Sequence, residues 1–265
     1  MMKSIQIIIK DRYNMEKWTL ITGASSGIGR ETALKLASEN HNLVICGRRQ
    51  ERLEQLRDII SKNSKVKVLI LSFDIQNLSR IEEKMKEFSS ELANVTTLIN
   101  NAGLAIGVDT LDKGNPHDWD QVIDTNIKGL LYMTRLMLPI LKTHKNADII
   151  NLGSVAGRWT YPGGAVYCAT KHAVRAISEG LRQDLFGSNI RVCCIEPGLV
   201  ETEFSLVRLK DEEKAKAVYA GIETLTPSDI ADTVSWVLNR PKHMTIQEIV
   251  IYPTAQASVT LVDRK

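Results

Sequence analysis

Short apolar runs alternate with helix-length amphipathic stretches along most of this 265-residue chain. The expected strands are residues 18–22, 43–46, 66–73, 97–100, 148–152, 191–196 and 249–252. Helical patterns between them include residues 28–38, 50–61, 79–91 and 166–186. Several strand candidates are rich in Val, Ile and Leu without alternating polar residues, as expected of strands buried on both faces. The pattern predicts an α/β fold with a doubly wound, mostly parallel sheet of seven strands and helices on both faces.

Composition excludes several classes of protein. The hydrophobic fraction of 43% and the charged fraction of 25% are those of an ordinary globular protein. The net charge is only +3, and no basic cluster is interleaved with aromatic residues, so we expect no nucleic-acid partner. No segment is long and apolar enough to span a bilayer, so we expect no membrane partner. The four cysteines (Cys46, Cys168, Cys193 and Cys194) form no C-x-x-C pair, which favours reduced thiols in a cytoplasmic protein over disulfides or a metal site.

The chain divides unevenly. Residues 1–14 hold a short apolar patch followed by charged residues, and they are expected to be a poorly ordered extension of unknown role. Met15 is an equally good start, because the first clear strand begins just after it. Residues 15–265 are expected to form a single domain. One charged insertion, residues 202–220, follows the sixth strand, where it is well placed to act as a lid over a ligand.

The sequence TGASSGIG at positions 22–29 follows the first strand and opens a helix. Glycines at 23, 27 and 29 permit a tight turn and a close approach of the backbone to a ligand. The N–H groups at the start of the helix then face a pyrophosphate. A plain connecting loop is the alternative, but the strand–turn–helix context favours a dinucleotide site of the Rossmann type.

The end of the second strand indicates which dinucleotide is bound. An NAD site usually has an acidic residue about 20 positions after the glycines, where it holds the ribose 2′-hydroxyl. Here the residues are Gly47, Arg48 and Arg49, with no acid among them. A guanidinium matches the 2′-phosphate of NADP in charge and geometry, and cations are disfavoured at a helix N-terminus unless they meet an anion. We therefore expect NADP(H) in preference to NAD(H), the alternative being that both arginines are simply solvated.

The glycine spacing G-x-x-x-G-x-G resembles that of the short-chain dehydrogenase/reductase family. Two more segments match it, Phe73-Asp74-Ile75 and the sequence NNAG at 100–103, and a Pro-Gly turn at 197–198 follows the sixth strand. The resemblance implies that the cofactor is held by Gly23, Ser25, Ser26, Gly27, Ile28, Gly29, Arg48, Arg49, Asp74, Ile75, Asn101, Ala102, Gly103, Tyr167, Lys171, Pro197, Gly198, Val200 and Thr202.

Tyr167 and Lys171 lie at i and i+4, so they share one helix face with small residues between them. Such a pair often lies on an ordinary helix surface, but Ser154 precedes it after a strand and Asn126 lies further upstream. These four residues resemble the family's catalytic tetrad. The resemblance implies that Tyr167 exchanges a proton with the substrate oxygen, Ser154 holds that oxygen, and Lys171 lowers the pKa of the tyrosine. Asn126 would bend its helix and support a proton relay.

The resemblance is strongest to the NADP-dependent 3-hydroxy acid dehydrogenases, through segments 47–56, 100–107, 124–135, 196–210 and 252–256. It implies oxidation of serine, allo-threonine, 3-hydroxypropionate or a related acid. A carboxylate needs a cation, and Arg208 in the lid is the candidate, unless it is simply solvated. Phe204 and Trp159 either line the substrate pocket or only pack.

Two alternatives stay open for the activity. The first is the reduction of another small ketone, aldehyde or quinone by the same chemistry. The second is a sensor that binds NADP without turnover. Segment 184–192 and the helix before it are expected at a subunit contact, and the family resemblance implies a homotetramer.

Overall fold

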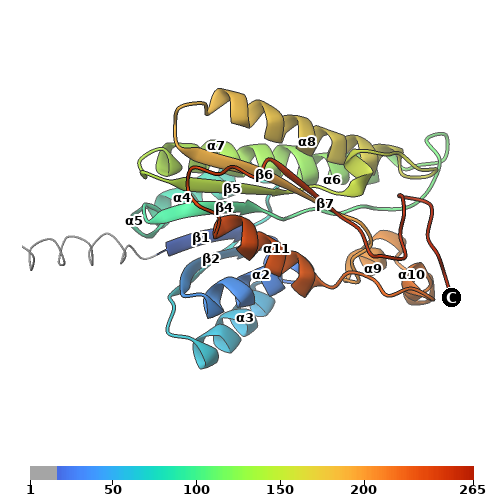
Figure 1. The fold of residues 1–265 in the computed structure, drawn as a ribbon, viewed down its shortest axis with the longest axis horizontal. Helices are drawn as coiled ribbons and strands as arrows, with labels where there is room; N and C mark the ends of the chain where they lie inside the picture. The colour runs from blue at the N-terminus through green and yellow to red at the C-terminus, as the bar shows by residue number, and fades with distance from the viewer. Residues whose placement is uncertain (1–16) are drawn as a thin grey trace, which may run out of the picture.

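The computed structural model describes residues 17–265, so the expected extension over residues 1–14 lies outside the described part of the chain. Seven strands form one sheet in the order β3-β2-β1-β4-β5-β6-β7, and every pair is parallel (Figure 1). The predicted fold is therefore confirmed. The strands are β1 (Lys17–Thr22), β2 (His41–Gly47), β3 (Val68–Ser72), β4 (Val95–Asn100), β5 (Ala147–Leu152), β6 (Ile190–Pro197) and β7 (Glu248–Ile251).

Helices cover both faces of the sheet (Figure 1). One face carries α2 (Gly27–Ser38), α3 (Gln50–Asn63) and α11 (Pro227–Leu238). The other carries α4 (Leu78–Glu87), α5 (Ser89–Leu92), α7 (Leu130–Leu141) and α8 (Ala165–Asp184). Successive residues of a strand pack on opposite faces of the sheet. Leu20 and Leu98 belong to the apolar cluster on one face, and Ile21 and Ile99 belong to the cluster on the other. Both faces are thus buried, which explains why these strands read as continuous apolar runs.

Some element boundaries differ from the predicted ones. The helix expected over residues 79–91 is two helices, α4 and α5, because the backbone at Phe88 leaves helical geometry (φ −110°, ψ 28°). Strand β3 begins two residues later than expected. Helices α6 (Pro116–Ile123) and α7, which were not predicted, flank a π-helical segment, η1 (Asp124–Gly129). These differences leave the carboxyl ends of the parallel strands, where a ligand is expected, at one edge of the sheet.

The charged insertion over residues 202–220 folds into two short helices, α9 (Phe204–Leu209) and α10 (Glu212–Tyr219). They lie at one end of the sheet, beside the C-terminus (Figure 1). The Arg264 guanidinium donates to the carbonyls of Val218 and Ala220, so the chain end caps the last turn of α10. In the described part of the chain, no helix combines the length and the apolar composition needed to cross a bilayer.

Candidate active site

A cavity of about 530 Å³ opens at the carboxyl ends of the strands. Its size is that of a small-molecule or cofactor site. The glycine loop, the ends of β2 to β6, and helix α9 all contribute to its walls. The predicted site residues that line it are Gly23, Ser25, Ser26, Gly27, Ile28, Arg48, Arg49, Asp74, Ile75, Asn101, Ala102, Gly103, Ser154, Tyr167, Lys171, Pro197, Gly198, Val200, Thr202, Phe204 and Arg208. The fold thus brings segments spread over 186 positions of the chain, from 23 to 208, to one hollow.

The glycine loop between β1 and α2 packs closely on the end of β4. Gly23 has a left-handed φ of +67°. A Cβ on Gly29 would lie 2.4 Å from Asn101 Nδ2 and 2.5 Å from the Gly23 carbonyl oxygen. Gly29 does not line the cavity, so its lack of a side chain serves the packing of loop on strand. A larger residue there would push the loop away from the sheet.

The Asn101 side chain fastens this loop. Its Nδ2 donates to the Thr22 carbonyl at 2.9 Å and to the Gly23 carbonyl at 3.2 Å. The Thr22 hydroxyl in turn accepts from the backbone N–H groups of Asn101 and Ala102. Sequence reasoning expected Asn101 at the cofactor. Asn101 lines the cavity, so its contact with the cofactor stays a prediction, and its amide donor also fixes the walls of the cavity through the two carbonyls that accept from it.

The two arginines after β2 lie at the cavity wall and make different contacts. Arg48 Nη1 lies 3.5 Å from Asp74 Oδ2, and its side chain is 60% exposed. Arg49 reaches back to the glycine loop, where its guanidinium donates to the hydroxyls of Ser25 and Ser26. Both cations are therefore placed beside the loop that is expected to meet a pyrophosphate.

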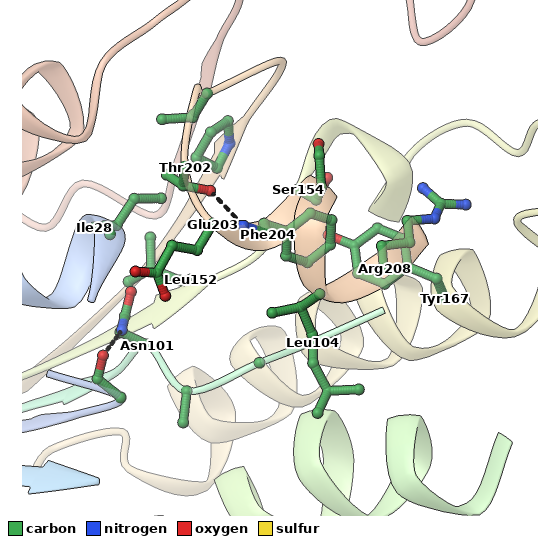
Figure 2. A pocket seen from close by; sticks show the side chains of 18 of the residues that line it. Ile28, Asn101, Leu104, Leu152, Ser154, Tyr167, Thr202, Glu203, Phe204 and Arg208 are labelled. Carbon is green, nitrogen blue, oxygen red and sulfur yellow. Dashed lines mark hydrogen bonds between the residues drawn. The ribbon is translucent and has the colours of Figure 1, made fainter. Parts of the chain in front are cut away.

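Tyr167 and Lys171 project from α8 toward the same cavity, as their spacing predicted. Lys171 Nζ lies 6.0 Å from the centroid of the Tyr167 ring and donates to the Leu152 carbonyl at 2.8 Å. The Tyr167 ring packs against Phe204, with centroids 5.5 Å apart (Figure 2). Ser154 follows β5, and its hydroxyl accepts from the Ala156 N–H. A phenol, a hydroxyl and an ammonium thus converge from two elements.

Burial governs the proton affinities of this pair. It raises the pKa of Tyr167 above its ordinary value, and the hydrogen bond with the Ser154 side chain offsets that by a smaller amount. Burial lowers the pKa of Lys171 to about 8. The predicted lowering of the tyrosine pKa by Lys171 is therefore not produced by the residues of the chain on their own. The phenol is neutral and the lysine is mostly protonated at pH 7.

Asn126 lies outside the cavity lining, in the π-helical segment η1. Its side chain exchanges two hydrogen bonds with the Leu104 backbone, at 2.8 and 2.9 Å, and its Nδ2 also donates to the Thr170 hydroxyl. This residue therefore ties η1 both to the segment after β4 and to helix α8. The wider turn of a π-helix at this point agrees with the expected bend of the helix.

Arg208 crosses from helix α9 to the wall formed by residues after β4. Its Nε donates to the Gly107 carbonyl at 3.0 Å and its Nη1 to the Tyr161 hydroxyl at 2.9 Å. The guanidinium carbon lies 5.8 Å from the centroid of the Tyr167 ring (Figure 2). Its remaining terminal nitrogen, Nη2, has no hydrogen-bond partner among residues 17–265. A cation with a free donor thus lies beside the phenol, as expected for a group that binds an anionic substrate.

Tyr161 and Gln256 are among the site residues that the sequence did not predict. Tyr161 lines the cavity and orients Arg208, but a tyrosine before a Pro-Gly-Gly turn gave no signal of that role. Gln256 is buried, and its Oε1 accepts from the Leu199 N–H, which holds the turn after Pro197. In contrast, Trp159 is 62% exposed and does not line the cavity, so it is not a wall of the pocket.

Comparison with known proteins agrees with this geometry. The family model described as short chain dehydrogenase matches residues 17–213. The chain belongs to the short chain dehydrogenase family. An NADP-dependent 3-hydroxy acid dehydrogenase of Salmonella typhi is 44% identical over 240 residues, which is 90% of this chain and 95% of that one. Sulfoacetaldehyde reductase 2 of Chromohalobacter salexigens is 39% identical and covers 94% of this chain and 100% of its own.

Among solved structures, the closed form of a serine dehydrogenase complexed with NADP⁺ superposes with a TM-score of 0.87. It is 42% identical, and the match covers 94% of this chain and 99% of that one. The cavity of this short chain dehydrogenase also has the features that a dinucleotide requires. The close approach at Gly23 and Gly29 makes a tight cradle, the N-terminus of α2 faces it, and two arginines stand beside it.

Proposed function

We propose that this chain is an NADP-dependent dehydrogenase that interconverts a short 3-hydroxy acid and its carbonyl product. Family membership, the cradle at the glycine loop and the 44% identity to an NADP-dependent 3-hydroxy acid dehydrogenase support the reaction class. Residues 15–265 act as one catalytic domain, in which residues 202–220 form a lid.

The N-terminus of α2 and the loop at 22–29 hold the pyrophosphate, and Arg48 and Arg49 hold the 2′-phosphate. Asp74 and Ile75 border the adenine, while residues 101–103, 197–198, Val200 and Thr202 border the nicotinamide. A Cβ built on Gly27 would lie 3.4 Å from the methyl group of Thr202. The lid therefore begins directly over the glycine loop. When bound, the cofactor accepts or supplies the hydride and, when oxidised, adds a positive charge beside the phenol.

Tyr167 exchanges the proton with the substrate oxygen. Ser154 donates a hydrogen bond to the same oxygen and fixes its position, which aligns the reacting carbon. The ammonium of Lys171 favours the tyrosinate at the moment when the proton leaves the phenol. Asn126 acts on this set indirectly, by fixing η1 and the residues after β4 against α8.

The position of Arg208 carries the proposal of an acidic substrate. Its guanidinium lies in the same cavity as the phenol, its Nη2 is free to donate, and its other nitrogens are anchored. The phenol marks the reacting oxygen, so a substrate that reaches Arg208 carries an anionic group a short distance from its hydroxyl. A 3-hydroxy acid has that shape. Phe204 packs over the Tyr167 ring and supplies an apolar wall between the two ends.

A panel of alcohols tests the substrate class. Serine, allo-threonine and 3-hydroxypropionate are supplied with NADP⁺ or NAD⁺, and cofactor reduction is followed by absorbance. We expect turnover of the acids with NADP⁺ and much lower kcat/KM with NAD⁺. Turnover of neutral ketones alone would contradict the acidic substrate and favour a general carbonyl reductase.

A second candidate is the reduction of a small aldehyde that carries a sulfonate. The 39% identity to a sulfoacetaldehyde reductase favours it, and Arg208 would bind a sulfonate as it would a carboxylate. The reverse assay, with sulfoacetaldehyde and NADPH, distinguishes the two. A higher kcat/KM for the sulfonate than for the carbonyl form of any 3-hydroxy acid would select this candidate.

Replacement of Arg208 by glutamine is expected to raise KM for the 3-hydroxy acid by about 10- to 100-fold, because a hydrogen bond to a charged group is lost. KM for a neutral alcohol should change by no more than about twofold. Initial rates across substrate concentrations measure both. Lys216→Gln is the matched control, since Lys216 is an exposed cation of the same lid segment. Equal effects of Arg208→Gln on acid and neutral alcohol would show that Arg208 only supports the lid.

We also infer a homotetramer in the cytoplasm. The four cysteines are free and buried, which suits a reducing compartment. Large apolar side chains are exposed at Leu131, Phe186, Trp236 and Val250, as expected of surfaces that meet other subunits. Light scattering coupled to size-exclusion chromatography measures the assembly, and a monomer would contradict it.

A further inference from the structure

A carboxylate of the lid segment lies among the arginines that follow β2. Glu203 Oε2 accepts from Arg49 Nη1 at 3.1 Å. Both carboxylate oxygens of Glu203 also accept from Arg52 Nη1, at 2.7 and 2.8 Å. Glu203 lines the cavity, so this ion pair stands within the cofactor cleft. It joins the start of helix α3 to the start of the lid helix α9.

Arg49 is shared between two partners. The same guanidinium that meets Glu203 donates to the hydroxyls of Ser25 and Ser26 in the glycine loop. The anion site expected for a 2′-phosphate is therefore already in contact with an anion of this chain. Partial burial raises the pKa of Glu203, but hydrogen bonds and charge from Arg52 and Arg49 outweigh it, so its pKa lies below the ordinary value. Glu203 is thus ionised at neutral pH.

The charges of this cluster do not accommodate both anions. Arg48, Arg49 and Arg52 face the carboxylates of Asp74 and Glu203, which leaves one positive charge in excess. A phosphate monoester carries about −1.5 to −2 at pH 7. Adding it while Glu203 stays makes the cluster negative, whereas adding it as Glu203 leaves makes the cluster close to neutral. Electrostatics therefore opposes simultaneous binding.

The ion pair is also one that a phosphate can break. The Arg49 and Glu203 side chains are 43% and 44% exposed, and exposed ion pairs contribute little stability. Phosphate forms stronger, bidentate hydrogen bonds with a guanidinium. Glu203 directly precedes Phe204, whose ring packs on Tyr167, so movement of the carboxylate acts on the start of α9.

We propose that Glu203 and the 2′-phosphate of the cofactor compete for Arg49, so that binding of a phosphorylated dinucleotide displaces the lid carboxylate. Glu203 is then a specificity-determining residue that weakens the preference for NADP over NAD, because NAD leaves the ion pair in place. The inference rests on the proposed NADP dependence. Glu203 would therefore weaken the binding of a phosphorylated dinucleotide. It would not help to hold every dinucleotide in the cleft.

Direct binding of NADPH and NADH to the Glu203→Gln variant tests this without turnover. Glutamine keeps the size of the side chain and removes its charge. We expect the Kd for NADPH to fall about two- to fivefold, and the Kd for NADH to stay within about twofold. Higher ionic strength should shrink the gain. Glu201→Gln is the matched control, because Glu201 is an exposed carboxylate two residues before Glu203 that makes no ion pair with the described residues. It should leave both constants unchanged.

An Arg49→Gln background separates competition from other effects. There, Glu203→Gln should no longer tighten NADPH binding, because the shared cation is gone; a persisting gain would overturn the assignment to Arg49. An unchanged or larger NADPH Kd in Glu203→Gln alone would overturn the competition itself. Failure of the unaltered protein to bind NADPH would instead refute the proposed function, and the two failures are thus distinct.

Discussion

Replacement of Tyr167 by phenylalanine is expected to lower kcat/KM by roughly 10³-fold, within the range of general acid–base catalysis. The change removes the hydroxyl that is proposed to exchange the proton, and it keeps the ring whose centroid lies 5.5 Å from that of Phe204. Because burial already disfavours the ionised phenol, folding does not depend on its charge. Steady-state kinetics with the best acid of the panel measures the loss. Thermal unfolding should show a midpoint close to that of the unaltered protein.

Tyr161→Phe is the matched control. Tyr161 lines the same cavity, but its hydroxyl accepts from Arg208, the residue proposed to bind the substrate. Its loss should act mainly on KM, whereas loss of the Tyr167 hydroxyl acts on kcat. NADPH should bind both variants with about the same Kd, since neither hydroxyl is needed to hold the phosphates. If Tyr167→Phe retained more than about a tenth of the activity, the proton would have another source and the assigned role would be wrong.

Replacement of Lys171 by methionine is expected to lower activity strongly and to stabilise the fold. The loss of activity should be about 10²–10⁴-fold, because the ammonium no longer favours the tyrosinate. Burial lowers the pKa of Lys171 from 10.5 to about 8. At pH 7 the lysine is therefore charged in both states, but the charge has a higher free energy in the folded state than in the unfolded state. That shift corresponds to about 3 kcal/mol. The lost hydrogen bond to the Leu152 carbonyl offsets about 1 kcal/mol, which leaves a gain near 2 kcal/mol.

The stability that Lys171→Met gains over the unaltered protein depends on pH, in a direction set by the pKa of Lys171 in the folded and unfolded states. Below pH 8 the lysine is protonated in both states, and the full cost of the buried cation is present. Between pH 8 and 10.5 the folded state loses its proton first, so the unaltered protein becomes more stable and the advantage of the variant shrinks. Chemical denaturation at pH 7 and pH 10 measures this. A Lys171→Met variant less stable than the unaltered protein at pH 7 would contradict the cost assigned to the buried charge.

Several functional positions were visible in the sequence because they lie in short, local motifs. The i, i+4 spacing of Tyr167 and Lys171 places both on one face of α8, and that spacing survives any packing of the helix. Glycines at positions 23 and 27 likewise favour a tight turn, and in the structure they have positive φ angles of +67° and +52°. The break between α4 and α5 at Phe88 was not predicted, because the apolar pattern of the sequence continues across Phe88 although the helical geometry of the backbone ends there.

The sequence by itself determined the alternation of strands and helices, the parallel sheet and the motifs expected at its carboxyl edge, because periodicity and glycine placement are local properties of the chain. Only the tertiary structure decided what each polar group contacts. Asn101 turned out to fasten the glycine loop, Trp159 to face solvent, and Glu203 to meet Arg49 across 154 positions of sequence. These contacts join segments that no local pattern relates, since the packing of separate elements determines which side chains come within hydrogen-bond distance.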